Sequence, residues 1–188
     1  MVKFSSLIPI ILILVLLTSF FTGCIDVSSD DGSSSNNSNG EEFEFYLLNG
    51  GKKKISEYRG KYVLIDLFGV RCPPCQNQML VLTQIFKDYK DTDLEIISIN
   101  VWIILGETAE LTEQFIYEAK EAKIYLNWTF GLDDPSGTIF NKYVPPDAGV
   151  PMLYILDKNG NIYYSNVGYT DYSALTGKLD ELLNSGGI

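Results

Sequence analysis

The chain has 188 residues, 46% of them hydrophobic and 13% aromatic, which is enough for one compact domain with its own core and a tail. Its 14 basic and 24 acidic residues give a formal net charge of −10, so it lacks the clustered Lys and Arg that nucleic acid binding requires. The absence of histidine excludes Ser-His-Asp and Cys-His nucleophile systems, His-ligated zinc or copper, and imidazole acid–base catalysis.

Residues 1–23 have the pattern of an export signal. Lys3 is followed by an almost wholly apolar run at 7–17 and by small residues that lead to Cys24. This ending resembles the lipobox of exported lipoproteins, although Phe21 stands where that motif has Leu. The resemblance implies cleavage before Cys24 and a lipid on Cys24. The apolar run is short for a spanning helix, which needs about 20 residues, but an uncleaved helical anchor and ordinary secretion remain alternatives.

Residues 24–42 consist largely of Ser, Asn, Gly and Asp, with almost nothing to bury. Such a segment cannot offset the entropy lost on ordering, so it is predicted to be a flexible polar tether. The globular domain is expected over residues 43–184. We therefore expect a domain held at the cell membrane by a lipid or a helix and facing outside the cytoplasm. Its acidic surface predicts a soluble monomer.

Hydrophobic patterning predicts strands that alternate with helices through the domain. Strands are expected at 43–48, 62–68, 94–102, 152–156 and 162–167, the second and third of them buried on both faces. Helices are expected at 76–89, 108–123, 134–143 and 171–184, where apolar residues recur at helical spacing. Asn49-Gly50 and Asn159-Gly160 are turn signals. This order predicts an α/β fold with a central mixed sheet flanked by helices.

The motif Cys72-Pro73-Pro74-Cys75 follows a buried strand and opens a helix. Unpaired backbone N–H groups at a helix N-terminus stabilise a thiolate, so Cys72 is predicted to be the reactive sulfur. Cys75, one helical turn away, lies within bridging distance and can resolve a mixed disulfide. Arg71 would add positive charge if its side chain turned toward Cys72. Pro73 and Pro74 suit the first helical turn, where a missing N–H costs least.

Other uses of a C-x-x-C pair are less well supported. A structural disulfide stays possible, although so short a loop restricts the unfolded chain only slightly. Zinc requires four ligands, and the sequence offers two cysteines here and no histidine. Covalent haem attachment requires a histidine after the second cysteine, where this chain has Gln76. The motif and its strand–helix context therefore favour a redox-active pair that needs no metal or organic cofactor.

Two segments resemble thioredoxins: the strand at 63–68 before the cysteine motif, and the segment 149–160, which reads GVPMLYILDKNG. The signal, the tether, the extra N-terminal segment and the insert between Val101 and Gly149 resemble the membrane-tethered TlpA/ResA group of thiol–disulfide oxidoreductases, and the fold also resembles the AhpC/TSA–Redoxin superfamily. The resemblance implies a thioredoxin fold with an N-terminal extension and a helical insert. It further implies extracytoplasmic thiol–disulfide exchange, in cytochrome c maturation or in general disulfide reduction.

The resemblance also assigns roles to individual residues. Cys72 matches the nucleophile and Cys75 the resolving cysteine. Pro151 matches the cis-proline beside the disulfide, and Val150 the backbone that pairs with a bound substrate strand. Asp66 matches the buried acid of thioredoxins. Burial should raise the pKa of Asp66 and suit it to take a proton from Cys75 through water, although an Asp satisfied by backbone or Lys contacts is the alternative.

Two positions depart from the pattern of these families. Arg71 replaces the tryptophan that usually precedes the first cysteine, and Gln78 replaces a glutamate common three residues after the second. Arg71, Pro73 and Pro74 are nevertheless expected to contact substrate. Because Gln78 cannot titrate, a role in handling apocytochrome is less strongly indicated than general redox exchange.

The expected partners are proteins that carry thiols or disulfides, and a membrane electron donor or acceptor. The direction of electron flow stays open, because Arg71 and the helix end favour an oxidant whereas the family resemblance favours a reductant. Two rival functions use the same cysteines. A copper chaperone or assembly factor would bind Cu(I) through both thiolates, although such proteins usually add a distal histidine. A thiol peroxidase would require a Thr-x-x-Cys setting, and Gly69 stands at the threonine position.

Overall fold

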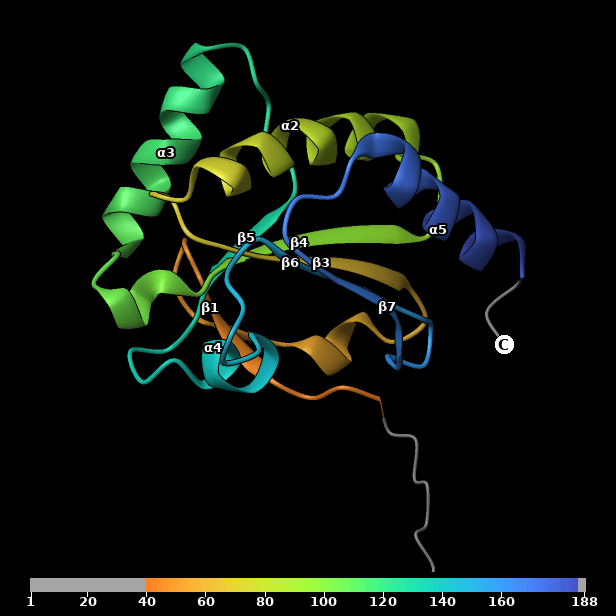
Figure 1. The fold of residues 1–188 in the computed structure, drawn as a ribbon, viewed down its shortest axis with the longest axis horizontal. Coiled ribbons are helices and arrows are strands. Elements are labelled where there is room, and N and C mark those ends of the chain that lie inside the picture. The colour runs from red at the N-terminus through yellow and green to blue at the C-terminus, as the bar shows by residue number, and fades with distance from the viewer. Residues whose placement is uncertain (1–39, 186–188) are drawn as a thin grey trace, which may run out of the picture. The chain divides into compact units, whose positions relative to one another are not determined.

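A seven-stranded mixed sheet organises residues 40–185, which are the part of the chain described by the computed structural model (Figure 1). Its strands are β1 (Glu44–Leu47), β2 (Lys52–Lys54), β3 (Tyr62–Phe68), β4 (Leu94–Asn100), β5 (Thr129–Leu132), β6 (Met152–Leu156) and β7 (Ile162–Val167). The spatial order is β2-β1-β5-β4-β3-β6-β7. Strands β3, β4 and β5 are parallel, and the remaining pairs are antiparallel.

Helices cover both faces of this sheet. The helices are α2 (Pro73–Asp88), α3 (Ala109–Glu121), α4 (Thr138–Tyr143) and α5 (Tyr172–Asn184), and two 3₁₀ turns add η1 (Ile55–Tyr58) and η2 (Trp102–Leu105). In Figure 1, α2, α3 and α5 lie above the sheet, whereas α4 and η1 lie below it. Among residues 40–185, no helix is both long and apolar enough to cross a membrane.

Strand β3 is buried along its whole length, as its apolar sequence predicts. It pairs in parallel with β4, which sets Asp66 opposite Ser98, and antiparallel with β6, which sets Asp66 opposite Leu153. Helix α2 returns over one face, and its buried side is formed by Cys75, Gln78, Met79, Val81, Leu82 and Ile85. The chain therefore passes from the most buried strand directly into the cysteine motif.

The predicted strands at 62–68, 152–156 and 162–167 are confirmed with the same bounds. Thr108 and Asp171 lie just outside α3 and α5, where their side chains accept hydrogen bonds from Leu111 N and Ala174 N as N-caps. Helix α2 begins three residues before the predicted start, because prolines fit its first two positions. The predicted helix at 134–143 is shorter, since its first residues form a turn.

Two strands have no counterpart among the predicted elements. Strand β2 is a run of three lysines, a residue depleted in strands, and it pairs because the turn at 48–51 folds it against β1. Strand β5 has only four residues, one of them Gly131, and it forms between β4 and β1. The insert expected to be helical therefore contains α3 and α4 but also a strand of the central sheet.

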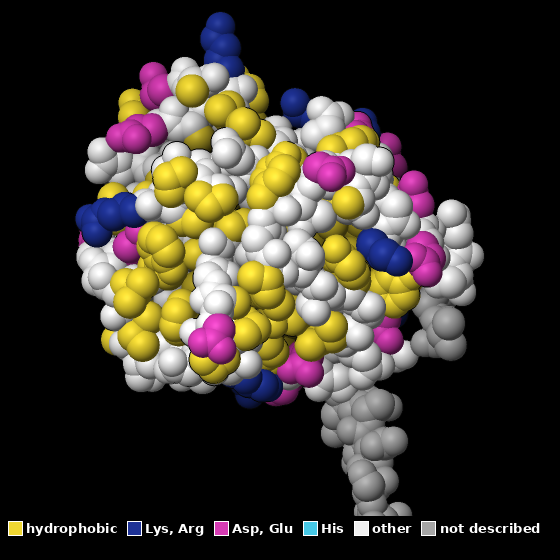
Figure 2. All heavy atoms as spheres, viewed as in Figure 1, with side chains coloured by type: hydrophobic (Ala, Val, Ile, Leu, Met, Phe, Trp, Pro, Cys, Tyr) yellow, Lys and Arg dark blue, Asp and Glu magenta, His cyan; other side chains and the backbone are white. Residues whose placement is uncertain are grey.

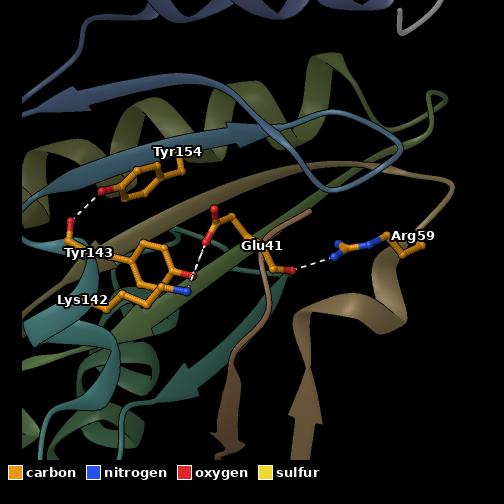
Figure 3. A network of polar contacts seen from close by, with 5 residues as sticks. All are labelled: Glu41, Arg59, Lys142, Tyr143 and Tyr154. Carbon is orange, nitrogen blue, oxygen red and sulfur yellow. Dashed lines mark hydrogen bonds and ion pairs between the residues drawn. The ribbon is translucent and has the colours of Figure 1, made fainter. Parts of the chain in front are cut away.

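Glu41 fastens the beginning of the described chain to the domain (Figure 3). Its carboxylate accepts hydrogen bonds from the Tyr143 hydroxyl and from Lys142 Nζ, and its backbone carbonyl accepts one from Arg59 at 2.6 Å. Its N–H donates to the carbonyl oxygen of Gly160 at 2.7 Å. Burial, together with the bond to Glu41, raises the pKa of Tyr143 far above its usual value. Glu41, which falls in the predicted tether, thus contacts the domain. The signal, Cys24 and the tether residues before 40 lie outside the described residues.

Candidate functional site: the paired cysteines at the start of α2

Cys72 and Cys75 form a disulfide at the end of β3 and the start of α2. Cys72 is the N-cap residue of α2, and its Sγ accepts a hydrogen bond from the Cys75 N–H at 3.3 Å. Both cysteines are buried, whereas Pro73 and Pro74 lie exposed in the first turn between them. When the pair is reduced, the N–H groups of this turn and the helix dipole stabilise a thiolate on Cys72.

Val150 and Pro151 lie beside this disulfide although they are nearly eighty residues away in sequence. The Val150–Pro151 peptide bond is cis, as predicted. The Val150 carbonyl oxygen lies 3.4 Å from Cys72 Sγ, within reach of a hydrogen bond from the reduced thiol. The Pro151 carbonyl accepts a hydrogen bond from Gly168 N at 2.8 Å, which fastens this loop to the end of β7. The fold thus brings both residues to the cysteines, while their role in substrate binding stays a prediction.

The loop before Cys72 is held by a buried carboxylate that sequence reasoning missed. Glu107 is 4% exposed. Its two oxygens accept hydrogen bonds from Val70 N at 2.8 Å, Arg71 N at 2.9 Å and Asn100 Nδ2 at 2.9 Å. In the sequence it is one acidic residue beside the start of a helix, with no pattern that distinguishes it from a solvated one. The loop is thus held by the Glu107 carboxylate, whereas the Arg71 side chain is exposed.

An aromatic side chain reaches the same loop from η2. The indole of Trp102 lies against Gly69, and a Cβ at position 69 would come within 2.3 Å of the indole ring. Ile104 and Leu105 of the same turn are exposed, and hydrophobic side chains extend over the left of the face in Figure 2, where η2 lies in Figure 1. Trp102 thus supplies an aromatic group beside the cysteine loop, where Arg71 supplies none.

Gln78 links α2 to the segment that follows β7. It is fully buried, its Nε2 donates to the Thr170 carbonyl at 3.2 Å, and its Oε1 accepts from Thr170 N at 2.8 Å. The amide both donates and accepts in this way, whereas an ionised carboxylate has no donor. The departure from glutamate at this position therefore has a structural consequence: the amide closes a two-bond clamp next to the site.

Asp66 is fully buried and has one satisfied oxygen. Its Oδ2 accepts a hydrogen bond from Ser98 Oγ at 3.0 Å, whereas its Oδ1 has no partner among the described residues. Burial raises its pKa to about 7, and the Ser98 bond opposes this rise only in part. Within residues 40–185 no lysine or backbone group satisfies Oδ1, so the carboxyl group is not the one expected if Asp66 were paired structurally. Its role in proton exchange stays a prediction.

We expect replacement of Glu107 by alanine to lower the free energy of unfolding by about 3 kcal/mol, since three buried donors lose their acceptor at about 1–3 kcal/mol each with partial relaxation. The free energy of unfolding of Glu107→Gln should lie between those of the wild type and Glu107→Ala, because the amide oxygen can accept a hydrogen bond but the NH₂ group faces a donor. Equilibrium urea denaturation measures the effect, with the exposed Glu113→Gln as control. An alanine variant as stable as that control would contradict the proposed contribution of the Glu107 hydrogen bonds.

Asp66 should make the protein less stable as the pH rises. Its pKa is about 7 in the fold against a reference value of 3.8, so the folded state binds this proton more tightly than the unfolded state. The resulting stabilisation is complete below about pH 4 and is lost as the pH rises through about 7. Asp66→Asn should therefore be more stable than the wild type at pH 8, by at most about 4 kcal/mol, and similar to it at pH 4.

Urea denaturation of the oxidised protein across this pH range tests the expectation. Asp91→Asn, at a position whose side chain is 90% exposed, is the control and should show no such divergence. Parallel pH dependences for the wild type and Asp66→Asn would show that the carboxyl group is not perturbed in the fold.

Comparison with known proteins agrees with this geometry. Thiol-disulfide oxidoreductase ResA from Geobacillus kaustophilus (strain HTA426) is 30% identical over 121 residues, which cover 61% of this chain and 59% of ResA. Thioredoxin-like protein YneN from Bacillus subtilis (strain 168) is 28% identical over 142 residues, which cover 74% of this chain and 75% of YneN. The match to ResA thus spans about three fifths of that protein's length.

The architecture is that of thioredoxins. The crystal structure of the thioredoxin domain of a thiol-disulfide oxidoreductase from Bacteroides vulgatus superimposes with a TM-score of 0.60 at 18% identity, covering 76% of this chain and 94% of that structure. The sequence pattern of the AhpC/TSA family matches residues 39–165, well over half of the chain. The chain therefore belongs to the AhpC/TSA family, and it has a thioredoxin fold.

Proposed function

We propose that this protein is a thiol–disulfide oxidoreductase that exchanges its Cys72–Cys75 disulfide with thiols and disulfides of other proteins. The observation that carries the proposal is the cysteine pair at the N-terminus of α2, with the cis-proline loop 3.4 Å from Cys72. The similarity to ResA and to the Bacteroides vulgatus oxidoreductase domain supports it. The exchange requires no metal or organic cofactor, because the two sulfurs carry both electrons.

In the reducing direction, the Cys72 thiolate attacks one sulfur of a substrate disulfide. A Cys72–substrate disulfide forms and the other substrate sulfur leaves as a thiolate. Cys75 then loses its proton to Asp66 through water and attacks the Cys72 sulfur. The Cys72–Cys75 disulfide forms, the second substrate thiolate leaves, and two electrons have passed to the substrate; the oxidising direction reverses each step.

The residues beside the disulfide have distinct roles in this proposal. The backbone of Val150, next to cis-Pro151, pairs with an extended substrate segment across Cys72. Arg71, Pro73 and Pro74 are exposed around the sulfur and contact that segment. Because the Glu107 carboxylate fixes the backbone at residues 70 and 71, the loop presents these contacts in one conformation.

We further propose that the domain is anchored outside the cytoplasmic membrane through Cys24 and exchanges electrons with a membrane donor or acceptor. Glu41, at the start of the described chain, is held by Gly160 and by Arg59, which precedes β3, whereas Cys72 follows the far end of that strand. Figure 1 shows the described chain beginning on the side away from the start of α2. The substrates we propose are disulfides of exported proteins in general, of which cytochrome c maturation is one case.

A redox titration of the full-length chain in glutathione or dithiothreitol buffers, read by thiol alkylation and mass, tests the exchange activity. The wild type should show one reversible two-electron couple between Cys72 and Cys75. Cys72→Ser should abolish it, and Cys75→Ser should trap a mixed disulfide through Cys72. A potential near about −270 mV or below identifies a reductant, and one near about −120 mV an oxidant. The absence of a reversible couple would contradict the proposed activity.

The anchor is tested by mass and partitioning of the chain recovered from a bacterial host. The wild type should enter the detergent phase as residues 24–188 carrying added lipid mass on Cys24. Cys24→Ser should lose that added mass while keeping the redox couple. A full-length mass in the membrane fraction would identify an uncleaved helix, and a cleaved chain in the aqueous phase would identify ordinary secretion; either result would overturn the lipid anchor.

A further inference from the structure

Asp66 faces a layer of polar and aromatic side chains beneath α2. Successive residues of a strand point to opposite faces of the sheet. Ile65 and Leu67 line a small cavity with Ile139 and Tyr143 on the α4 side, so Asp66 lies on the α2 side. Its in-register neighbour on β4 is Ser98, which is also fully buried. These two polar side chains share an otherwise apolar space.

A directed chain of hydrogen bonds enters this space from Trp128. The indole Nε1 of Trp128 donates to Ser98 Oγ at 3.0 Å, and Ser98 Oγ donates to Asp66 Oδ2 at 3.0 Å. An indole N–H can only donate, so the Ser98 oxygen is the acceptor in the first bond. Its single proton has the Asp66 carboxylate at 3.0 Å and the Met79 sulfur at 3.9 Å as acceptors, of which the carboxylate is the stronger. This direction leaves Oδ1 of Asp66 as the oxygen with no partner among the described residues.

This chain of hydrogen bonds lies under the first turns of α2, which carry the cysteines. Ser98 Oγ lies 3.9 Å from Met79 Sδ, and Met79 follows Cys75 by four residues on the buried side of that helix. Side chains four residues apart on a helix are neighbours on one face. Ser98 is therefore next to the helical turn that holds the resolving cysteine.

The indole of Trp128 is held in place by two rings. It stacks on Phe130 with centroids 5.6 Å apart and an interplanar angle of 25°, and it packs against Phe86 of α2 at 5.8 Å. These ring contacts fix the orientation of the indole, so that its N–H points at Ser98. Because the indole N–H occupies one side of the Ser98 oxygen as a donor, the hydroxyl proton points away from the indole, where Asp66 accepts it.

We propose that Trp128 and Ser98 are positioning residues for the proton exchange between Asp66 and Cys75: they occupy Oδ2 and so make Oδ1 the atom that takes and returns the proton. The inference rests on the proposed role of Asp66. From α2 the titratable groups are the thiols of Cys72 and Cys75 in the reduced protein; β4 presents Ser98, and Leu153 of β6 is apolar. Among the described residues no charged side chain contributes to the pKa of Asp66, which leaves Ser98 as the hydrogen bond that opposes burial.

The test follows the resolving step in the reduced full-length Cys24→Ser chain, in which Cys72 and Cys75 are the two thiols, with 5,5′-dithiobis(2-nitrobenzoate) as probe. The first release of thionitrobenzoate reports attack by Cys72, and the second reports attack by Cys75. In this chain the second phase should depend on pH with an inflection near 7. Ser98→Ala and Trp128→Phe should move this inflection upward, by about one pH unit for Ser98→Ala, and leave the first phase unchanged. Ser98→Thr, which keeps the hydroxyl, should retain the wild-type inflection.

Asp66→Asn separates the two ideas. If Asp66→Asn leaves the inflection in place, the role of Asp66 fails and the inference fails with it. If Asp66→Asn removes the inflection but Ser98→Ala and Trp128→Phe do not move it, the relay, that is, the positioning of Asp66 by Trp128 and Ser98, is overturned while the role of Asp66 stands. Trp128→Phe keeps a ring in the stack, and an unchanged first phase shows that the site has folded.

A measurement on the wild type needs no substitution in the relay. With ¹⁵N-labelled tryptophan, the indole N–H signal of Trp128 should titrate with the same inflection as the second phase, because protonation of Asp66 changes the charge at the end of the hydrogen-bond chain. The Trp102 signal is the internal reference. An indole signal of Trp128 that stays constant through the inflection would also overturn the relay.

Discussion

The structure depends on the burial of β3 between two neighbouring strands and two layers of helices. A strand with both faces covered must have an apolar sequence, and the sequence of β3 is apolar except for Asp66. Strand β3 runs from the end of the sheet where Arg59 contacts Glu41 to the end where Cys72 lies. It also desolvates the single carboxyl group on the strand, so the fold that positions the cysteines raises the pKa of the acid beneath them.

Three buried polar side chains surround the cysteine motif, and they differ in how fully they are satisfied. Glu107 accepts three hydrogen bonds and Gln78 makes two, so each holds a neighbouring backbone segment rigidly. Asp66 accepts one and keeps an unpartnered oxygen. An unsatisfied buried polar atom costs stability, so it persists where another property of the site depends on it. The hydrogen bonds of Glu107 and Gln78 thus hold the backbone around the disulfide in place.

The aromatic ring beside the cysteine loop comes from a segment distant in sequence. Arg71 leaves the position before Cys72 without an aromatic ring, and Trp102 from η2 lies against the same loop. This packing requires Gly69, because any Cβ there would overlap the indole. An exposed apolar edge at Ile104 and Leu105 continues from that ring. The exposed apolar surface beside the cysteine loop therefore comes from an insert of the fold.

The sequence by itself determined the local features. A continuous apolar run specified β3, and the two prolines and the spacing specified a cysteine pair on the first turn of α2, because each depends on residues adjacent in the chain. The cis bond at Pro151 was expected only from the resemblance of its segment to thioredoxins, and the structure has it. Only the tertiary structure decided that β2 and β5 are strands. Strand β2 is a run of lysines and β5 has only four residues, one of them a glycine, and each extends because a neighbouring strand offers backbone partners. It also decided which polar residues matter. Glu107, Ser98 and Trp128 acquire their roles from contacts between segments tens of residues apart, and no pattern along the chain encodes a hydrogen bond between groups that meet only after the sheet has formed.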